Sequence, residues 1–153
     1  MKSISLKSAL FLILISGISL SSCNSNDELS AGIAANLVTV DNEGTTLINS
    51  VDLKSAITGS DAITESLSDW LKFMREEEKL AHDLYVALGK IYSVPVFKNI
   101  PRAELNHMNA VLTILTTYSI EDPASAEEGV FNNADLQALY NSLLETGKTS
   151  LPI

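Results

Sequence analysis

The chain is short of several residue types that common functions need. Cys23 is the only cysteine among 153 residues, so no internal disulfide can form, and a structural zinc site with cysteine ligands is ruled out. Lysine and arginine are few, with 10 against 19 aspartates and glutamates and a formal net charge of -9. This balance argues against nucleic acid as a partner, because nucleic-acid-binding surfaces are basic, and against adhesion to anionic lipid headgroups. The sequence has no phosphate-binding glycine loop, nucleophile elbow or Ser–His–Asp arrangement, and we assign no catalytic residue.

A long hydrophobic run is also lacking, but a short one lies near the N-terminus. Two lysines precede an apolar run over residues 9–20, which is shorter than the roughly 20 apolar residues that span a bilayer. This layout is typical of a secretory signal peptide. The next four residues, Leu20-Ser21-Ser22-Cys23, resemble the bacterial lipobox, whose cysteine is acylated and becomes the first mature residue. We expect a lipoprotein signal peptide over residues 1–22 and fatty acyl chains such as palmitate on Cys23. The alternative is an ordinary signal peptide with a cysteine there by chance.

The same segment predicts where the protein resides. Two or more acyl chains on one residue make membrane anchoring stable. Asp27 and Glu28 follow closely and resemble surface-export signals of some Gram-negative lipoproteins. We therefore expect an exported protein of the cell envelope, anchored by lipid in the outer membrane.

The rest of the chain divides at about residue 65. Residues 23–65 are rich in Ser, Asn, Thr, Asp and Ala and have no aromatic residue, which predicts a lipid-anchored, flexible and disordered linker with one weak apolar turn near residues 47–57. Helical periodicity begins at Leu67, so we expect a folded, all-α domain over residues 66–153. Neither strand-like alternation nor an internal repeat is visible.

Three amphipathic helices are expected in this domain. Apolar residues recur at steps of three and four over about residues 68–90, then after residue 99, and again over residues 133–147. The first stripe consists of Leu67, Leu71, Met74, Ala81, Tyr85 and Leu88. The expected cap and stop residues are Ser66 or Ser68, Asn99 with Pro101 in the first turn, Asn132 or Asn133, and Gly147. The aromatic residues Trp70, Tyr85, Phe97 and Tyr118 are expected in the core.

Three polar residues interrupt these apolar stripes. Glu78 lies on the stripe of the first helix, and Glu104 and His107 lie on that of the second, spaced so that both share one face. A carboxylate buried without a partner costs several kcal/mol, and a bound cation is a natural compensator. Two carboxylates and an imidazole suit iron or manganese. The alternative interpretation is an exposed polar pair on one helix and a solvated acidic face over Glu76-Glu77-Glu78. We expect that solvated face for Glu76 and for one of the other two glutamates.

The sequence also resembles a known family. The stretches that carry the resemblance are Met74-Arg75-Glu76-Glu77-Glu78-Lys79-Leu80-Ala81-His82-Asp83-Leu84-Tyr85, Phe97-Lys98-Asn99-Ile100, Glu104-Leu105-Asn106-His107-Met108, Gly129-Val130-Phe131-Asn132 and Leu136-Gln137-Ala138-Leu139-Tyr140. They are similar to a ferritin-like family of bacterial proteins, the domain of unknown function 2202. The resemblance implies a ferritin-like helical bundle with metal ligands at Glu78, Glu104 and His107, and Glu77 as a substitute for Glu78. His82 stands where the family tends to have arginine and is not counted as a ligand.

The resemblance also implies that one chain is incomplete. The family continues into two further bundle helices, so we expect a truncated, partial bundle of two long antiparallel helices and a shorter third. Two functions then stay open. In one, a homodimer completes a di-iron or di-manganese site. In the other, the domain is a non-enzymatic envelope lipoprotein with a degenerate site that acts as an interaction module.

Overall fold

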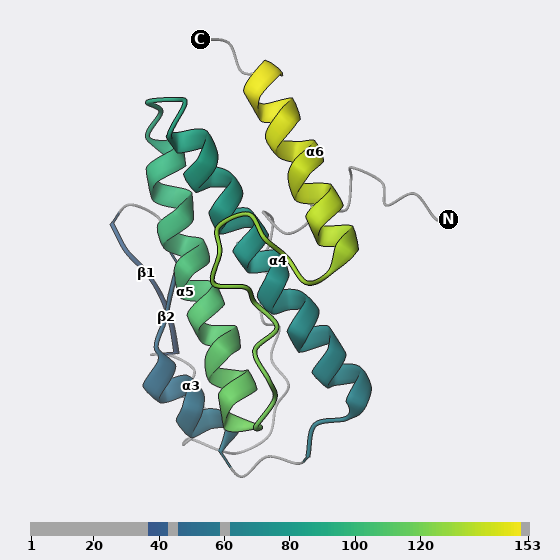
Figure 1. The fold of residues 1–153 in the computed structure, drawn as a ribbon. Helices are drawn as coiled ribbons and strands as arrows, with labels where there is room; N and C mark the ends of the chain where they lie inside the picture. The colour runs from purple at the N-terminus through teal and green to yellow at the C-terminus, as the bar shows by residue number, and fades with distance from the viewer. Residues whose placement is uncertain (1–36, 43–45, 59–61, 151–153) are drawn as a thin grey trace, which may run out of the picture.

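Two long antiparallel helices dominate the structure (Figure 1). It is a computed structural model that describes residues 37–42, 46–58 and 62–150. Its elements are β1 (Val38–Val40), β2 (Thr46–Ile48), α3 (Ser50–Ile57), α4 (Glu65–Gly89), α5 (Val96–Thr117) and α6 (Ala134–Ser150). α4 and α5 pack along their length, α6 lies against α4, and the segment between α5 and α6 runs back across the pair (Figure 1). The expected all-α class is confirmed as a predominantly helical fold.

A small hairpin and a short helix precede the long helices. β1 and β2 pair antiparallel, with Val38 opposite Ile48, and α3 packs against α5. The side chain of Asn49 caps α3 by accepting hydrogen bonds from two backbone N–H groups. These elements lie in the stretch that we expected to be a disordered linker, so that expectation is wrong for its described residues. The prediction failed because strands of three residues are too short to show periodicity, and only the apolar turn near residues 47–57 was visible.

Both long helices begin earlier than expected. α4 is capped by Thr64, whose hydroxyl accepts from the N–H of Leu67 at 3.2 Å, and not by Ser66 or Ser68. α5 begins at Val96 after Pro95, one turn before the expected cap at Asn99. Proline has a fixed φ that suits the start of a helix, so Pro95 starts α5 although it offers no side-chain cap.

Proline and glycine inside the helices have packing roles. Pro101 lies within α5, beyond its first turn, and is buried. α6 is capped by Asn133 as expected, but it continues through Gly147 to Ser150, so Gly147 is not a stop. A Cβ atom at Gly147 would lie 2.7 Å from Cδ2 of Leu88, which shows that glycine lets α6 approach α4 closely.

The core consists of three apolar clusters along α4. The clusters contain Leu71, Val111 and Leu115 at one end, Leu80, Phe131, Leu136 and Tyr140 in the middle, and Leu88, Tyr92 and Phe97 at the other end. Of the aromatic residues expected in the core, Phe97 is buried and Tyr85 and Tyr118 are partly buried. Trp70 is 54% exposed, so its prediction is wrong. It lies on a partly exposed side of α4, which Phe73 shares.

The predictions for the N-terminal segment concern residues outside the described part. Residues 1–22 and Cys23 fall there, so the signal peptide and the lipid anchor stay predictions. Among the described residues, no helix has the length and apolar character that crossing a membrane requires.

Candidate metal centre

The seam between α4 and α5 holds three side chains with metal-ligating atoms. Glu78 comes from the middle of α4, and Glu104 and His107 come from α5. Because Glu104 and His107 are three residues apart, they lie on one face of α5. One ligand atom of each residue lies within 4.8 Å of the other two. The structure thus brings together the three residues that the sequence singled out, which we call the carboxylate–histidine triad.

Close contacts between His107 and the two carboxylates hold the triad together. Nδ1 of His107 lies 3.2 Å from Oε2 of Glu104 and 3.4 Å from Oε2 of Glu78. Hydrogen bonds to Glu104 and Glu78 raise the pKa of His107 to about 10, while burial raises the pKa of Glu78. The two shifts compete for one proton. We place it on His107, because the ordinary pKa of imidazole is about 2 units above that of a carboxyl group.

The triad is shielded but not closed. The exposed side-chain fractions are 13% for Glu78, 17% for Glu104 and 30% for His107. Two further groups border it. Burial and the neighbouring Glu78 raise the pKa of Glu77 to about 7, and burial and the charge of Glu104 raise the pKa of Tyr85. Glu77 is not part of the three-residue cluster, so the structure offers Glu78, and not its expected substitute, to α5.

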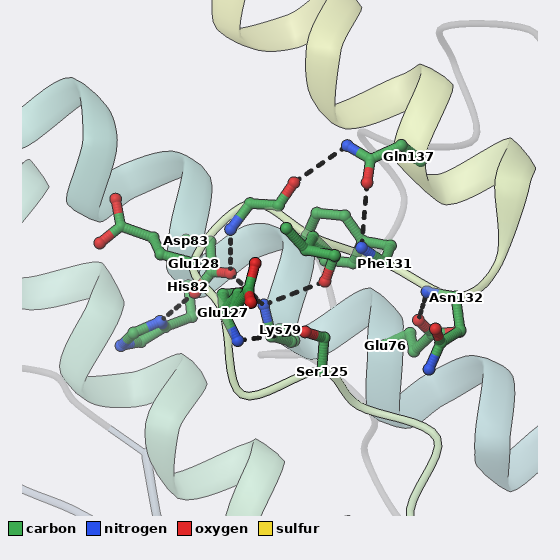
Figure 2. A network of polar contacts seen from close by, with 12 residues as sticks. Glu76, Lys79, His82, Asp83, Ser125, Glu127, Glu128, Phe131, Asn132 and Gln137 are labelled. Atoms are coloured by element: carbon green, nitrogen blue, oxygen red, sulfur yellow. Dashed lines mark hydrogen bonds and ion pairs between the residues drawn. The ribbon is translucent and has the colours of Figure 1, made fainter.

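A second group of charged residues lies on another side of α4. It consists of Arg75, Glu76, Lys79 and Asp83, all at most 8% exposed. They face residues 121–133, which we call the strap, and Figure 2 shows most of the contacts between them. No buried side-chain nitrogen or oxygen in the described part of the chain lacks a hydrogen-bond partner. These charges are therefore matched, as buried charges have to be.

Lys79 and Asp83 form the centre of this network. The ammonium group of Lys79 donates to Asp83, to the carbonyl of Glu127 at 2.8 Å and to that of Val130 at 3.4 Å (Figure 2). Asp83 also accepts from the N–H of Gly129 at 2.8 Å. Burial raises the pKa of Asp83, but its hydrogen bonds, that from Lys79 first, outweigh burial and leave the pKa lowered.

Glu76 and Arg75 hold the two ends of the strap. Glu76 accepts from the N–H groups of Asn132 and Asn133, which precede α6, so its negative charge lies at the positive end of that helix. Arg75 donates two hydrogen bonds of 3.1 Å to the carboxylate of Asp122. Glu76 is only 3% exposed, so the expectation that it lies on a solvated face is wrong.

Sequence reasoning missed this network because a charged helix face usually faces water. The signal that could have found it is the spacing of Glu76, Lys79 and Asp83, which places three charges on one side of α4. Their partners are mostly backbone groups of the strap, and these leave no mark in side-chain patterns. His82 contacts Asp83 at 2.9 Å and is not part of the triad.

Comparison with known proteins identifies the family of the helical part of the chain. The family model described as "Uncharacterized protein domain (DUF2202)" matches residues 67–152, which confirms the family expected from the sequence. An uncharacterized protein of Methanocaldococcus jannaschii is 43% identical over 89 residues, which cover 58% of this chain and 48% of that protein. The chain thus spans about half the length of this curated relative. No solved structure matches the chain.

Proposed function

Because this chain belongs to the DUF2202 family of uncharacterized protein domains, whose model matches nearly all of α4, α5 and α6, we propose that its function centres on a metal ion held by Glu78, Glu104 and His107. Iron and manganese suit this donor set of two carboxylates and one imidazole, with no thiolate. On this proposal the fold is a ferritin-like bundle. Bound iron or manganese would supply one-electron redox chemistry, and the chain's own residues would hold and shield it.

The observation that carries this proposal is the convergence of three ligand atoms from two helices within 4.8 Å. The charges support it. With a proton on His107, two carboxylates and one imidazolium leave an excess negative charge between two packed helices. A divalent cation in place of that proton, with neutral His107, leaves the group neutral. Metal binding therefore releases a proton and removes the net charge from a shielded site.

We propose that a second copy of the chain completes the coordination. Three ligand groups are fewer than the six positions that iron or manganese commonly fills, and His107 remains 30% exposed. On the partly exposed side of α4, Trp70 and Phe73 are 54% and 39% exposed. Two hairpins of α4 and α5 packed against each other would form a four-helix bundle, the arrangement in which two Glu and two Glu-x-x-His pairs bind two ions.

Metal titration of the full chain tests the proposal. The chain, purified in detergent and freed of metal with a chelator, should bind Mn²⁺ in a calorimetric titration at neutral pH. Loss of a residue that only hydrogen-bonds to a metal ligand commonly weakens metal binding 10–100-fold. Glu104 is a proposed ligand itself, so Glu104→Gln should weaken Mn²⁺ binding by at least that factor. The matched control Glu145→Gln changes an exposed carboxylate on α6 and should leave the affinity unchanged. Equal Mn²⁺ affinity in Glu104→Gln and wild type would refute the site.

The lipid anchor is a separate part of the proposal. We propose that Cys23 carries acyl chains and holds the domain at an envelope membrane, with the outer membrane as its location. Mass spectrometry of the purified chain should show the acyl mass on a peptide that begins at Cys23. A mature chain that begins elsewhere, or an unmodified Cys23, would refute this part.

A non-enzymatic interaction module is the competing function, and the exposed Trp70 and Phe73 favour it. If these side chains dock another protein, the chain should be monomeric, should bind no Mn²⁺, and should lose its partner when Trp70 is changed to Ser. If they form the homodimer, Trp70→Ser should instead halve the mass in solution and weaken Mn²⁺ binding. Light scattering and the same titration separate the two outcomes.

A further inference from the structure

The turn between α4 and α5 exposes an unusual amount of aliphatic surface. Ile91 is 51% exposed, Val94 46% and Val96 43%. They lie close together in the sequence, around Pro95, at one extreme end of the long hairpin (Figure 1). We call these three side chains the aliphatic tip. Single exposed apolar side chains are ordinary, but three at the end of a rod-shaped hairpin form a projecting apolar patch.

Three lysines lie near the aliphatic tip in the sequence or the fold. Lys90 precedes it and Lys98 follows it, and both are exposed. A third, the exposed Lys148, has its backbone at this end of the hairpin, because the hydroxyl of Tyr92 donates to the backbone carbonyl of Lys148 at 3.1 Å. Acidic groups of the described chain also lie at this end: Glu128, which pairs with Lys90 at 2.6 Å, and Glu145 on α6.

The opposite end of the hairpin has four acidic groups, against the basic Lys72 and Arg75 on α4. Glu65 and Asp69 begin α4, and Glu121 and Asp122 follow α5 there. Of these, Asp122 pairs with Arg75. The net charge of the whole chain is -9 and argues against contact with lipid headgroups, but the structure separates the charges along the hairpin. The lysines Lys98 and Lys148 therefore lie at the same end of the hairpin as the aliphatic tip.

We propose that the aliphatic tip, with Lys90, Lys98 and Lys148 around it, inserts into the interface of a phospholipid bilayer. Apolar side chains that enter the boundary between headgroups and acyl chains, with lysines beside them at the phosphate level, are the usual pattern of interfacial binding. The tip then fixes the orientation of the domain, with the long hairpin standing on the membrane and the carboxylate–histidine triad above it.

The length of the N-terminal segment permits this orientation. About 15 residues separate Cys23 from Val38, the start of β1, and such a segment can reach at most about 50 Å. α5 has 22 residues and is about 33 Å long. An anchor at Cys23 therefore allows the tip to touch the same membrane, although the proposal needs only a lipid surface within reach.

A fluorescent depth probe on the full chain tests the proposal. The variant Val94→Cys, labelled with an environment-sensitive dye, is mixed with vesicles of phosphatidylcholine and phosphatidylglycerol that contain a lipid-borne quencher. Lipid should shift its emission to the blue and quench it. The matched control is the same dye at Asp69→Cys, an exposed position at the opposite end of α4, where neither change should occur.

Two further variants make the result specific. Each methylene withdrawn from a membrane lowers partitioning about fourfold, so adding Ile91→Ser and Val96→Ser should raise the lipid concentration for half-maximal quenching of the Val94→Cys probe tenfold or more. Adding Lys98→Glu should raise it only when the vesicles contain phosphatidylglycerol. None of these residues belongs to the triad, so Mn²⁺ binding should be unchanged.

Three outcomes would overturn the proposal. One is an unquenched Val94→Cys probe in every vesicle. Another is equal quenching at Asp69→Cys, which would show that the chain has no preferred orientation. The third is a blue shift without lipid and without quenching, together with a doubled mass in solution, which would show that a second copy covers the tip.

Discussion

Lys79→Met is the sharpest test of the buried network, because it keeps the length and packing of the side chain and removes only the charge. The ammonium group of Lys79 lies on Asp83, on two carbonyl groups of the strap, and 4.7 Å from the ring centroid of Phe131. Methionine can keep the contact with Phe131. It cannot donate a hydrogen bond, so Asp83 loses its cation.

The magnitude follows from what remains around Asp83. Breaking a buried ion pair by removing one partner destabilises a protein by about 3–5 kcal/mol. Asp83 keeps the N–H of Gly129 at 2.8 Å and the ring of His82 at 2.9 Å, so the lower end applies, about 3 kcal/mol. For a domain of this size, that corresponds to a fall in Tm of roughly 12 °C.

Urea unfolding followed by circular dichroism measures the change. Lys98→Met, at an exposed position on α5, is the matched control and should stay within about 0.5 kcal/mol of wild type. Adding Asp83→Asn to Lys79→Met should recover part of the loss, because the amide still accepts from Gly129 and carries no charge. A change below about 1 kcal/mol in Lys79→Met, or no recovery in the double variant, would refute the interpretation that the charge pair holds the strap.

Three further predictions concern single positions. The pKa of Glu77 is about 7 in the folded chain against 4.5 normally, so the unfolding free energy falls as the pH rises from 4.5 through 7. Glu77→Gln should remove this fall. Above pH 7 it should raise the unfolding free energy in urea by about 1 kcal/mol, a value that allows for the partial exposure of Glu77. The pKa of His107 is raised from 6.5 to about 10, so protonated His107 stabilises the metal-free chain fully below pH 6.5 and not at all above pH 10. His107→Gln should therefore flatten the dependence of the unfolding free energy on pH between these values. An unchanged slope would contradict the placement of the proton on His107. Gly129 has φ 74°, and a Cβ atom there would lie 2.9 Å from the Tyr140 ring. Gly129→Ala should therefore lower the unfolding free energy by about 2 kcal/mol. An unchanged urea midpoint would show instead that the strap can shift.

The sequence predicted the long helices and failed at their ends. The stripe through Leu71 and Leu88 is strong enough to identify α4, because burial of an apolar face is what stabilises a helix in a protein. At the start of α4, several neighbouring residues of similar chemistry could provide the cap. Thr64, Ser66 and Ser68 can all accept a backbone N–H, and which one does so depends on where the preceding chain turns. Periodicity carries no information on that.

The candidate site was predictable for a different reason. Glu78, Glu104 and His107 interrupt apolar stripes, and an interruption in a core-facing position is visible in the sequence. The charges that hold the strap do not interrupt a stripe. They lie on a face that is polar throughout and is covered only because residues 121–133 return over it, a long-range event that no helical pattern of α4 records. Trp70 is the converse case, an aromatic residue that stays 54% exposed.

The run Glu76-Glu77-Glu78 shows how the helix converts one sequence into three environments. Successive residues on an α-helix are rotated by about 100°, so three adjacent carboxylates must face three directions. Glu76 faces the strap and accepts backbone N–H groups, Glu77 lies half-buried beside the triad, and Glu78 faces α5 and pairs with His107. The three substitutions to Gln should therefore have different effects. Glu76→Gln should loosen the strap, Glu77→Gln should stabilise the fold at neutral pH, and Glu78→Gln should abolish the triad. A common effect of all three would mean that the run acts only as a block of negative charge.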